Sequence, residues 1–350
     1  MNDNIESIQA LPVLALLGPT AVGKTALSLR IAEEFACEII SLDSMQVYRR
    51  MNIGTAKIRP AEMRGIVHHC LDLVEPDTDY DAARYAQDAS AAMATIRQKG
   101  KIPLLVGGSG LYLRALEDGL FAAPPVDKET RKNLLIQLNN VGIEKLHDEL
   151  ATCDPESAAR IDRHDRSRVL RALEIYRASG LPWTEHLRRQ RLTERLTEQQ
   201  SDTATPANLP VNRSVNCFIK IGLDCPRDQL YRRIDERCRA MLNEGLIEET
   251  RELLAAGYSP ACKAMQAIGY RHVIAWLTGE NDYEKMLELF MRDTRRYAKR
   301  QFTWFRHDAA ITWFDWQDTD AVLAFIANAL REAAGGSAGG SVSNPPDSAV

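Results

Sequence analysis

Short apolar runs alternate with amphipathic segments in the first third of the chain. The run at residues 13–17, Val-Leu-Ala-Leu-Leu, is apolar at every position, which is typical of a strand buried on both faces of a parallel sheet. Similar runs follow it, and between them apolar residues recur at helical spacing. Strands are predicted at residues 13–17, 37–42, 101–106 and 218–223, and helices at residues 26–32 and 80–98. This alternation predicts an α/β fold, with a parallel sheet flanked by helices.

The pattern changes after Pro124 and Pro125. From Asp127 to about residue 200 the apolar periodicity is helical and the surface positions are strongly charged, which predicts a helical insertion. A polar linker follows at residues 196–214, and a strand pattern then returns at residues 218–223. The predicted parts are a first core segment at residues 11–126, the helical insertion at 127–200, a second core segment at 215–332, and disordered tails at 1–10 and 334–350.

Composition narrows the possible classes of protein. The chain has 350 residues, of which 45% are hydrophobic and 26% are charged, as is usual for a globular protein. Its formal net charge of −4 does not indicate a nucleic-acid-binding protein, so any surface that binds RNA must be local. The seven cysteines are scattered without a C-x-x-C pair, which indicates reduced thiols and no zinc site. We find no signal peptide pattern and no long apolar run, and we expect a cytoplasmic protein that does not enter a membrane.

The residues between the first strand and the first helix form a phosphate-binding pattern. They match G-x-x-x-x-G-K-[ST], the P-loop, in its strand–loop–helix setting. Backbone N–H groups and the positive end of the following helix can then surround a diphosphate. Lys24 would place its charge on the terminal phosphate oxygens, and the Thr25 hydroxyl would bind a Mg²⁺ that bridges them. The predicted diphosphate-binding residues of the loop are Gly18, Pro19, Thr20, Ala21, Val22, Gly23, Lys24 and Thr25.

Further candidate residues follow the other predicted strands. Asp43 comes after the strand at residues 37–42, at the carboxyl edge of the sheet where ligands bind. From position alone it could be a Mg²⁺ ligand, a general base or the N-cap of a following helix. The glycine-rich residues 107–110 favour a second substrate contact at the same edge. His68 and His69 are adjacent and would point to opposite faces of a strand, so we do not expect them to share a metal ion.

Two stretches rich in arginine could form a local basic surface. In the insertion, residues 167–176 form a predicted helix among arginines, which suits either phosphate recognition or a solvated face paired with acidic residues. Near the end, residues 291–306 place basic residues at three- and four-residue spacing, interleaved with aromatic residues. This helix could bind an RNA backbone and stack splayed bases, or its aromatic residues could belong to the core.

Several of these segments, in this order, resemble the tRNA dimethylallyltransferases, and the chain is similar to the bacterial type of that family over about residues 12–316. The segments that carry the resemblance are residues 18–25, 43–48, 52–57, 106–112, 268–271 and 298–304. The resemblance implies a P-loop NTPase-like sheet, and transfer of a dimethylallyl group from dimethylallyl diphosphate to N6 of the adenosine beside the tRNA anticodon. We expect the enzyme to be a monomer.

The resemblance also implies roles for the residues at the sheet edge. Asp43 is expected to be the general base for the N6 amine, a poor nucleophile because its lone pair is delocalised into the purine. The P-loop, Arg237 and Mg²⁺ are expected to neutralise the departing diphosphate. The adenine must leave its stack to reach Asp43, so we expect a deep channel with the diphosphate entering from the opposite side.

The same resemblance predicts contacts with the anticodon stem-loop of tRNA in several parts of the chain. They are Asp43, Ser44, Met45, Gln46, Ser109, Arg131, Ser167, Arg168, Val169, Leu170, Arg171, Gln266, Ala267, Ile268, Gly269, Tyr270, Arg271, Lys299, Arg300, Gln301, Phe302, Thr303, Trp304, Phe305 and Arg306. Two alternatives remain, an isopentenyltransferase acting on free adenine nucleotides and a P-loop small-molecule kinase. The long insertion and the tRNA-type motifs argue against the first, and a kinase would leave residues 291–306 without a role.

Overall fold

The computed structural model describes residues 11–119, 126–189 and 217–335. The chain divides into two compact units, one formed by Met1–Gly119 with Arg213–Val350 and the other by Leu120–Asn212. The predicted insertion at 127–200 falls within the second unit, and its last residues, from 190 on, lie outside the described part of the chain.

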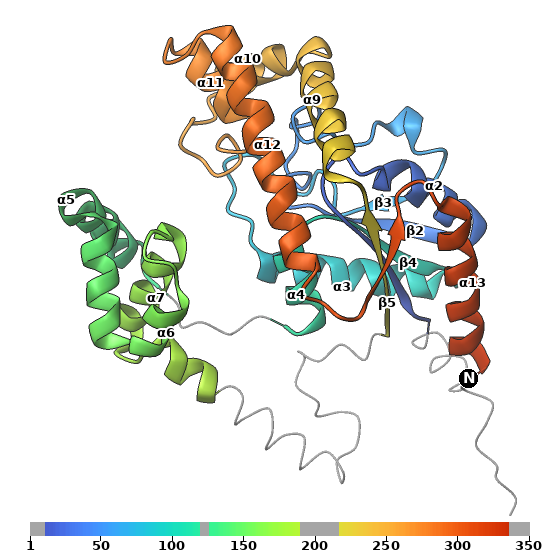
Figure 1. The fold of residues 1–350 in the computed structure, drawn as a ribbon, viewed down its shortest axis with the longest axis horizontal. Coiled ribbons are helices and arrows are strands. Elements are labelled where there is room, and N and C mark those ends of the chain that lie inside the picture. Colours follow the sequence, from blue (N-terminus) through green and yellow to red (C-terminus); the bar gives the residue numbers. More distant parts are fainter. Residues whose placement is uncertain (1–10, 120–125, 190–216, 336–350) are drawn as a thin grey trace, which may run out of the picture. The chain divides into compact units, whose positions relative to one another are not determined.

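A parallel sheet of six strands forms the centre of the first unit (Figure 1). The strand order is β3-β2-β4-β1-β5-β6, and every pairing between neighbours is parallel. The strands are β1 (Val13–Leu17), β2 (Cys37–Leu42), β3 (His68–His69), β4 (Ile102–Gly107), β5 (Phe218–Asp224) and β6 (Ile311–Asp315). The predicted α/β fold and the four predicted strands are therefore confirmed, and two strands of the sheet, β3 and β6, lie outside the four predicted ranges.

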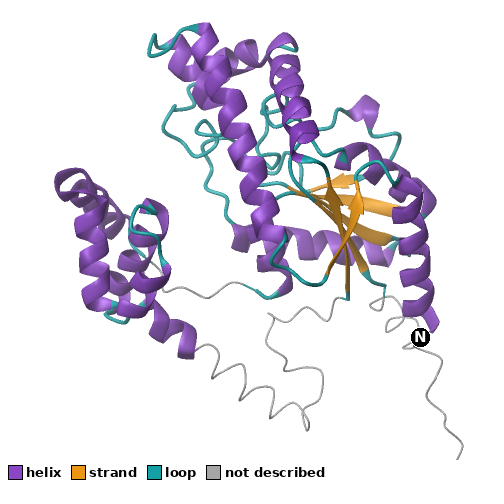
Figure 2. Ribbon diagram, viewed as in Figure 1, coloured by secondary structure: helices purple, strands orange, loops and turns teal. Residues whose placement is uncertain are grey.

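The central strands are buried because they carry apolar residues at successive positions. All five residues of β1 are fully buried, and Leu14 pairs with Leu104 on one side and Ile219 on the other. Helices cover the sheet (Figure 2), and those that contact the strands or one another are α2 (Lys24–Glu34), α3 (Ala82–Gln98), α4 (Gly110–Glu117) and α13 (Thr319–Gly335). The sheet edge at which β1, β2 and β4 end is the place where the loops of the site begin.

A layer of helices continues the first unit beyond that edge. It consists of α9 (Arg227–Asn243), α10 (Leu246–Ala255), α11 (Tyr270–Leu277) and α12 (Tyr283–Phe305) (Figure 1). Helix α10 packs on α9 and α11, and α12 packs on α9 and α11 and also contacts α4. Asp282 caps the long helix α12 by accepting a hydrogen bond from the N–H of Lys285 at 2.7 Å. The helix predicted at residues 291–306 is thus the second half of α12.

The second unit is a small helical cluster. Its helices are α5 (Lys128–Cys153), α6 (Pro155–Arg160) and α7 (Arg166–Ser179), and residues 183–189 are also helical. Leucines of α5 such as Leu134 and Leu150 pack on Val169 and Leu173 of α7, which gives the unit its own apolar core. Helical periodicity in this part of the sequence is explained by that core.

The ends of the described chain require one correction. Helix α13 continues to Gly335, so residues 334 and 335 belong to a helix and not to the predicted tail, because the alanines at the end of α13 prolong it. Residues 1–10 and the rest of the predicted C-terminal tail lie outside the described residues. None of the described helices is long and apolar enough to cross a membrane.

Candidate active site

The P-loop connects β1 to α2 and borders a cavity of the first unit. Gly18 (φ 151°) and Gly23 (φ 110°) have backbone conformations that favour glycine, and α2 begins at Lys24 directly after the second of them. The cavity, about 630 Å³, is lined by Thr20, Lys24 and Thr25, and we call it the P-loop cavity. The loop therefore presents the N-terminus of α2 to an enclosed space, as the motif predicts.

Lys24 turns back onto the loop that carries it. Its Nζ donates hydrogen bonds to the carbonyl oxygens of Gly18 at 2.9 Å and of Pro19 at 2.7 Å. Burial of the ammonium, together with the nearby charge of Arg237, lowers the pKa of Lys24 to about 7, while Asp43 acts in the opposite direction. An anion that enters this cavity would supply a negative charge close to the Lys24 ammonium, whose hydrogen-bond partners here are neutral carbonyl groups.

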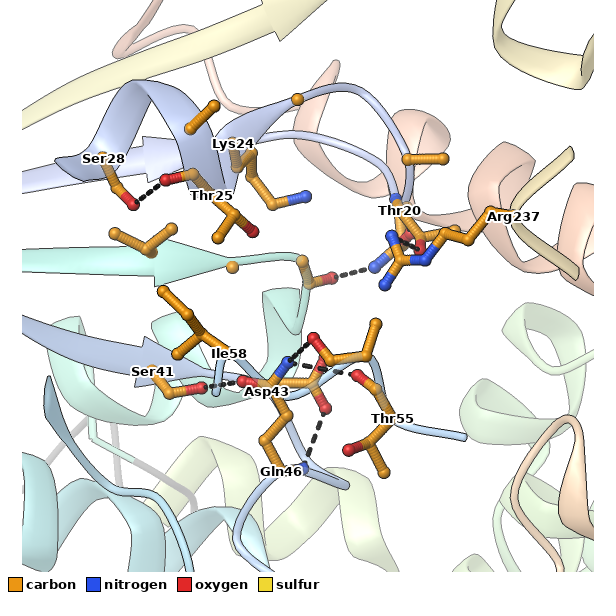
Figure 3. A pocket seen from close by; sticks show the side chains of 18 of the residues that line it. Thr20, Lys24, Thr25, Ser28, Ser41, Asp43, Gln46, Thr55, Ile58 and Arg237 are labelled. Atoms are coloured by element: carbon orange, nitrogen blue, oxygen red, sulfur yellow. Dashed lines mark hydrogen bonds between the residues drawn. The ribbon is translucent and has the colours of Figure 1, made fainter. Parts of the chain in front are cut away.

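Arg237, from α9, lies across the mouth of the loop. One of its guanidinium nitrogens donates to Thr20 Oγ1 at 3.3 Å, and Figure 3 shows the two side chains together beside the cavity. Its buried guanidinium interacts with the carboxylate of Asp43, although desolvation lowers the pKa of the arginine overall. Arg237 thus lines the same cavity as Asp43, and its charge can act on an anion bound in the loop.

Asp43 directly follows β2 and faces the P-loop across the cavity (Figure 3). Its Oδ1 accepts hydrogen bonds from the backbone N–H groups of Met45 at 2.8 Å and Gln46 at 3.3 Å. These bonds fix the orientation of the carboxylate, but a turn follows and not a helix, so the helix-cap alternative is wrong. Asp43 stays available as a base or a metal ligand.

The second glycine-rich loop lies beside the P-loop, as predicted, and Gln301 of α12 connects the two. Gln301 accepts a hydrogen bond from the N–H of Thr20 at 2.8 Å and donates one to the carbonyl oxygen of Gly108 at 3.0 Å. A Cβ atom on Gly108 would lie 2.0 Å from the Gln301 amide, so a larger residue there would displace the Gln301 side chain. Ser109 Oγ accepts from the N–H of Ser44 at 3.2 Å and joins this loop to the Asp43 loop.

A second cavity, about 280 Å³, adjoins the first and shares lining residues with it. We call it the adjoining cavity. The shared residues are Thr20, Asp43, Thr55, Arg237 and Tyr297. It is also lined by Ser44, Met45, Gln266, Ala267, Ile268, Arg271 and Arg300. Three predicted tRNA-binding segments, far apart in the sequence, are thereby brought together, and the two cavities meet at Asp43 as a channel requires.

Some residues of the site were missed by sequence reasoning. The P-loop cavity has apolar walls formed by Ile39, Ile58, Leu71 and Val106, which resemble ordinary core residues in the sequence. Arg233 also lines this cavity, donates to the carbonyl oxygen of Ala21 at 2.8 Å and stacks 4.2 Å over the ring of Trp316. Its spacing of four residues from Arg237 on one helix was a signal that could have identified it.

Other predicted tRNA contacts do not face a surface. Val169, Tyr270 and Phe305 are fully buried, Val169 in the core of the helical unit, and their aromatic or apolar side chains pack inside the protein. Leu170 packs against the core of the helical unit. Gln301 is buried between the two glycine-rich loops. These side chains therefore pack in the interior or support a loop. Helical periodicity in the sequence does not distinguish such positions from positions that face RNA.

The stretch at residues 299–306 is divided between different surfaces. Arg300 lines the adjoining cavity, whereas Lys299, Phe302, Thr303 and Arg306 line a separate cavity of about 590 Å³ with Tyr231 and Arg227. Trp304 is exposed and its ring lies where a Cβ on Gly110 would be. The basic face predicted on this helix is therefore divided between two cavities.

In the helical unit, the predicted RNA-binding arginines have acidic partners. Arg131 and Arg171 lie 3.5 and 3.2 Å from the carboxylate of Glu174, and Arg168 lies 3.5 Å from Asp165. Ser167 is exposed. Paired charges were one of the two alternatives for this helix, and the pairs leave the guanidinium groups at the surface, so RNA contact there stays a prediction.

The two adjacent histidines have different surroundings. His69 lies 2.8 Å from the carboxylate of Glu38, while His68 lines the P-loop cavity. Within the described residues, no group of three or more His, Cys, Asp or Glu side chains is arranged to hold a metal ion. A protein-only metal site is therefore not found in that part of the chain.

Comparisons with known proteins agree with the geometry. A family model described as IPP transferase matches residues 46–308. A tRNA dimethylallyltransferase of Desulfotalea psychrophila is 46% identical over 321 residues, which are 92% of this chain and 96% of that protein. One of Syntrophobacter fumaroxidans is 42% identical over 90% of this chain and 87% of its own length.

Solved structures give the same result. The crystal structure of a full-length tRNA isopentenylpyrophosphate transferase from Bacillus halodurans has a TM-score of 0.66 and 36% identity, and the match covers 93% of this chain and 99% of that one. A eukaryotic dimethylallyltransferase acting on tRNA has a TM-score of 0.63 and 29% identity over 88% of this chain and 74% of its own. The sequence comparisons and the structural comparisons thus indicate the same family of transferases.

Proposed function

The chain belongs to the IPP transferase family, and we propose that its P-loop cavity binds dimethylallyl diphosphate while the adjoining cavity admits the target adenosine of a tRNA. The activity is transfer of a dimethylallyl group to N6 of the adenosine next to the anticodon, with release of diphosphate. The observation that carries the proposal is that the two cavities meet at Asp43.

The lining of the P-loop cavity suits an amphiphilic substrate. One end offers the P-loop N–H groups with Lys24, and the walls include Ile39, Leu71 and Val106. A diphosphate that carries a five-carbon chain needs both, because its charged end must be neutralised and its hydrocarbon benefits from leaving water.

Breaking the allylic C–O bond leaves an electron pair on the diphosphate, so cations at that end lower the barrier. Lys24, at the start of α2, and Arg237, beside Thr20, supply two positive charges. The Thr25 hydroxyl also lines this cavity, and it would hold Mg²⁺ together with phosphate oxygens and water, since Mg²⁺ in phosphate sites takes few protein ligands. When bound, the ion would neutralise further charge on the diphosphate.

Asp43 is assigned as the general base. As the new N6–C bond forms, the amine must lose a proton, and a carboxylate at the junction of the cavities can accept it. The N–H groups of Met45 and Gln46 hold Oδ1, and we assign the proton to Oδ2. The bonds balance, because the C–O bond breaks, the N–C bond forms and the proton moves to Asp43.

We propose that the enzyme acts as a monomer in the cytoplasm, with the anticodon stem-loop of a tRNA as its partner. The test of function is incubation with Mg²⁺ and radiolabelled dimethylallyl diphosphate, with unmodified tRNA, AMP or ATP offered separately. Label should enter tRNA only, and Asp43→Ala should abolish it. Label in AMP or ATP alone would indicate a free-nucleotide transferase, and ATP turnover without prenyl transfer would indicate a kinase.

A further inference from the structure

The carboxylate of Glu249, on α10, binds the backbone of the loop at residues 51–57. Its oxygens accept hydrogen bonds from the N–H of Asn52 at 2.9 Å, of Ile53 at 2.9 and 3.1 Å, and of Gly54 at 3.2 Å. Three successive N–H groups around a carboxylate form an anion-binding arrangement, which is filled here by a side chain of the protein itself. The conformation of this loop therefore depends on a residue almost two hundred positions away.

Tyr270 completes the same contact from a third segment. Its hydroxyl donates to Glu249 Oε1 at 2.5 Å, and its ring is fully buried against Gly54. A Cβ atom on Gly54 would lie 2.4 Å from the Tyr270 ring, so the loop approaches the start of α11 as closely as glycine allows. Glu249 thus joins the loop, α10 and α11.

Hydrogen bonds made by Gln46 connect the loop at residues 51–57 to Asp43, the proposed base. The carbonyl oxygens of Thr55 and Ala56 accept from the side-chain amide of Gln46 at 3.2 and 3.4 Å. The amide oxygen of Gln46 accepts from Ser41 Oγ at 2.8 Å, and its backbone N–H donates to Asp43. Gln46 therefore connects the loop held by Glu249 to the Asp43 carboxylate, through one hydrogen-bonded contact with each.

The same contact sets the rim of the adjoining cavity. Gly54 and Thr55 line one part of it, and residues 266–268 with Arg271, which flank Tyr270, line another. Glu249 is half-buried behind the loop and is not among the residues that line either cavity. It can influence the reaction only through the groups that it holds.

We propose that Glu249 is a positioning residue for the acceptor side of the reaction, which fixes the loop at residues 51–57 so that the rim of the adjoining cavity and Asp43 fit the target adenosine. The proposal rests on the function proposed above for the two cavities. The anion-binding end of the P-loop cavity is held by the backbone of the P-loop and by Gln301 and Arg233. Thr55 and Ala56 of the loop held by Glu249 line another part of that cavity. Loss of Glu249 should therefore reduce the reaction with tRNA much more than it weakens binding of the diphosphate.

The test uses Glu249→Gln in the full chain, with Glu248→Gln as the matched control. Gln keeps the size of the side chain but replaces one acceptor oxygen by an NH₂ group that faces N–H donors. Glu248 is the exposed neighbour on the same helix and pairs with Arg251, so its substitution makes the same change of charge outside the contact. We expect Glu249→Gln to lower kcat/KM for tRNA about tenfold or more, with a much smaller change in the KM for dimethylallyl diphosphate, and Glu248→Gln to leave both constants unchanged.

Hydrogen exchange of the amides at residues 52–54 provides a readout that does not depend on activity. These amides should exchange faster in Glu249→Gln than in the native chain, and at the native rate in Glu248→Gln. Equal losses for tRNA and diphosphate, or unchanged kcat/KM for tRNA in Glu249→Gln, would overturn the proposal. Failure of the function proposed for the cavities would be seen separately, as absence of transfer by the native chain, while the exchange rates would still report the local contact.

Discussion

The two cavities of the site are built in different ways. The P-loop cavity takes most of its anion-binding groups from consecutive residues, 18–25, whose backbone conformation is local, and Arg237 of α9 adds one cation to them. The adjoining cavity is assembled from segments as distant as residues 43–45, 266–268 and Arg300, held by tertiary contacts such as those of Glu249. The difference teaches that a phosphate site can be encoded in one short motif, whereas a site for a large acceptor depends on the whole unit.

Among the changes that test one cavity alone, the largest effect is expected for Lys24→Met in the P-loop cavity. Removal of the cation nearest to the loop carbonyls should lower kcat/KM for dimethylallyl diphosphate by roughly 10²–10³-fold, because charge on the departing diphosphate is no longer neutralised. Affinity for tRNA, measured by filter binding in the absence of dimethylallyl diphosphate, should not change. A parallel loss of tRNA affinity would mean that the cavities do not act separately.

The pH dependence of diphosphate binding is a second test of the P-loop cavity. The pKa of Lys24 is about 7 in the free protein, and a bound diphosphate should raise it, so binding takes up a proton. Affinity should then fall as pH rises above 7, by up to about tenfold per pH unit, until the higher pKa of the complex is reached. Calorimetry in buffers of different ionisation enthalpy would show the uptake, with Lys24→Met giving the contribution of the ligand alone.

Gln301→Ala tests whether α12 serves the diphosphate as well as tRNA. Gln301 joins Thr20 of the P-loop to Gly108, so its loss leaves an N–H and a carbonyl oxygen without these partners. We expect affinity for dimethylallyl diphosphate to fall about tenfold, with little change in binding of tRNA. The opposite pattern, weaker tRNA binding with intact diphosphate affinity, would restore Gln301 to the tRNA-contact residues.

The smallest effects are expected for single cations at the acceptor side. Arg300 lines the adjoining cavity and Lys299 a separate one, and both are exposed. Each change to alanine should weaken tRNA binding a few-fold and reduce the slope of log K against log salt by about 0.7–0.9. Binding titrations from low to moderate salt measure the slope, and an unchanged slope in both variants would remove these residues from the phosphate contacts.

The sequence predicted the fold and the P-loop cavity well, for a physical reason. Apolar runs such as 13–17 are long enough to indicate buried strands, and all groups of the P-loop are neighbours in the chain. Asp43 could be placed at the sheet edge from its strand, although its role could not be decided there, and family resemblance indicated a base. The structure adds that its carboxylate is shared by both cavities.

The acceptor side was predicted less well, because the sequence does not show which face of a helix is covered. Tyr270 and Phe305 were predicted to contact tRNA but are buried, and Gln301 supports the P-loop. The contact between Glu249 and the loop at 52–54 gives no local signal, since its partners are separated by more than 190 residues. Tertiary contacts of this kind become visible only in the folded unit.

The most direct test of the account is a single-turnover measurement on Asp43→Asn. Asn keeps an oxygen that can accept from the N–H groups of Met45 and Gln46, but it cannot take a proton as a carboxylate does. With labelled dimethylallyl diphosphate and tRNA both bound, the account predicts that transfer slows by roughly 10²–10⁴-fold while the two dissociation constants stay within about twofold. A native rate of transfer in Asp43→Asn would contradict the assignment of Asp43 as the base at the junction of the two cavities.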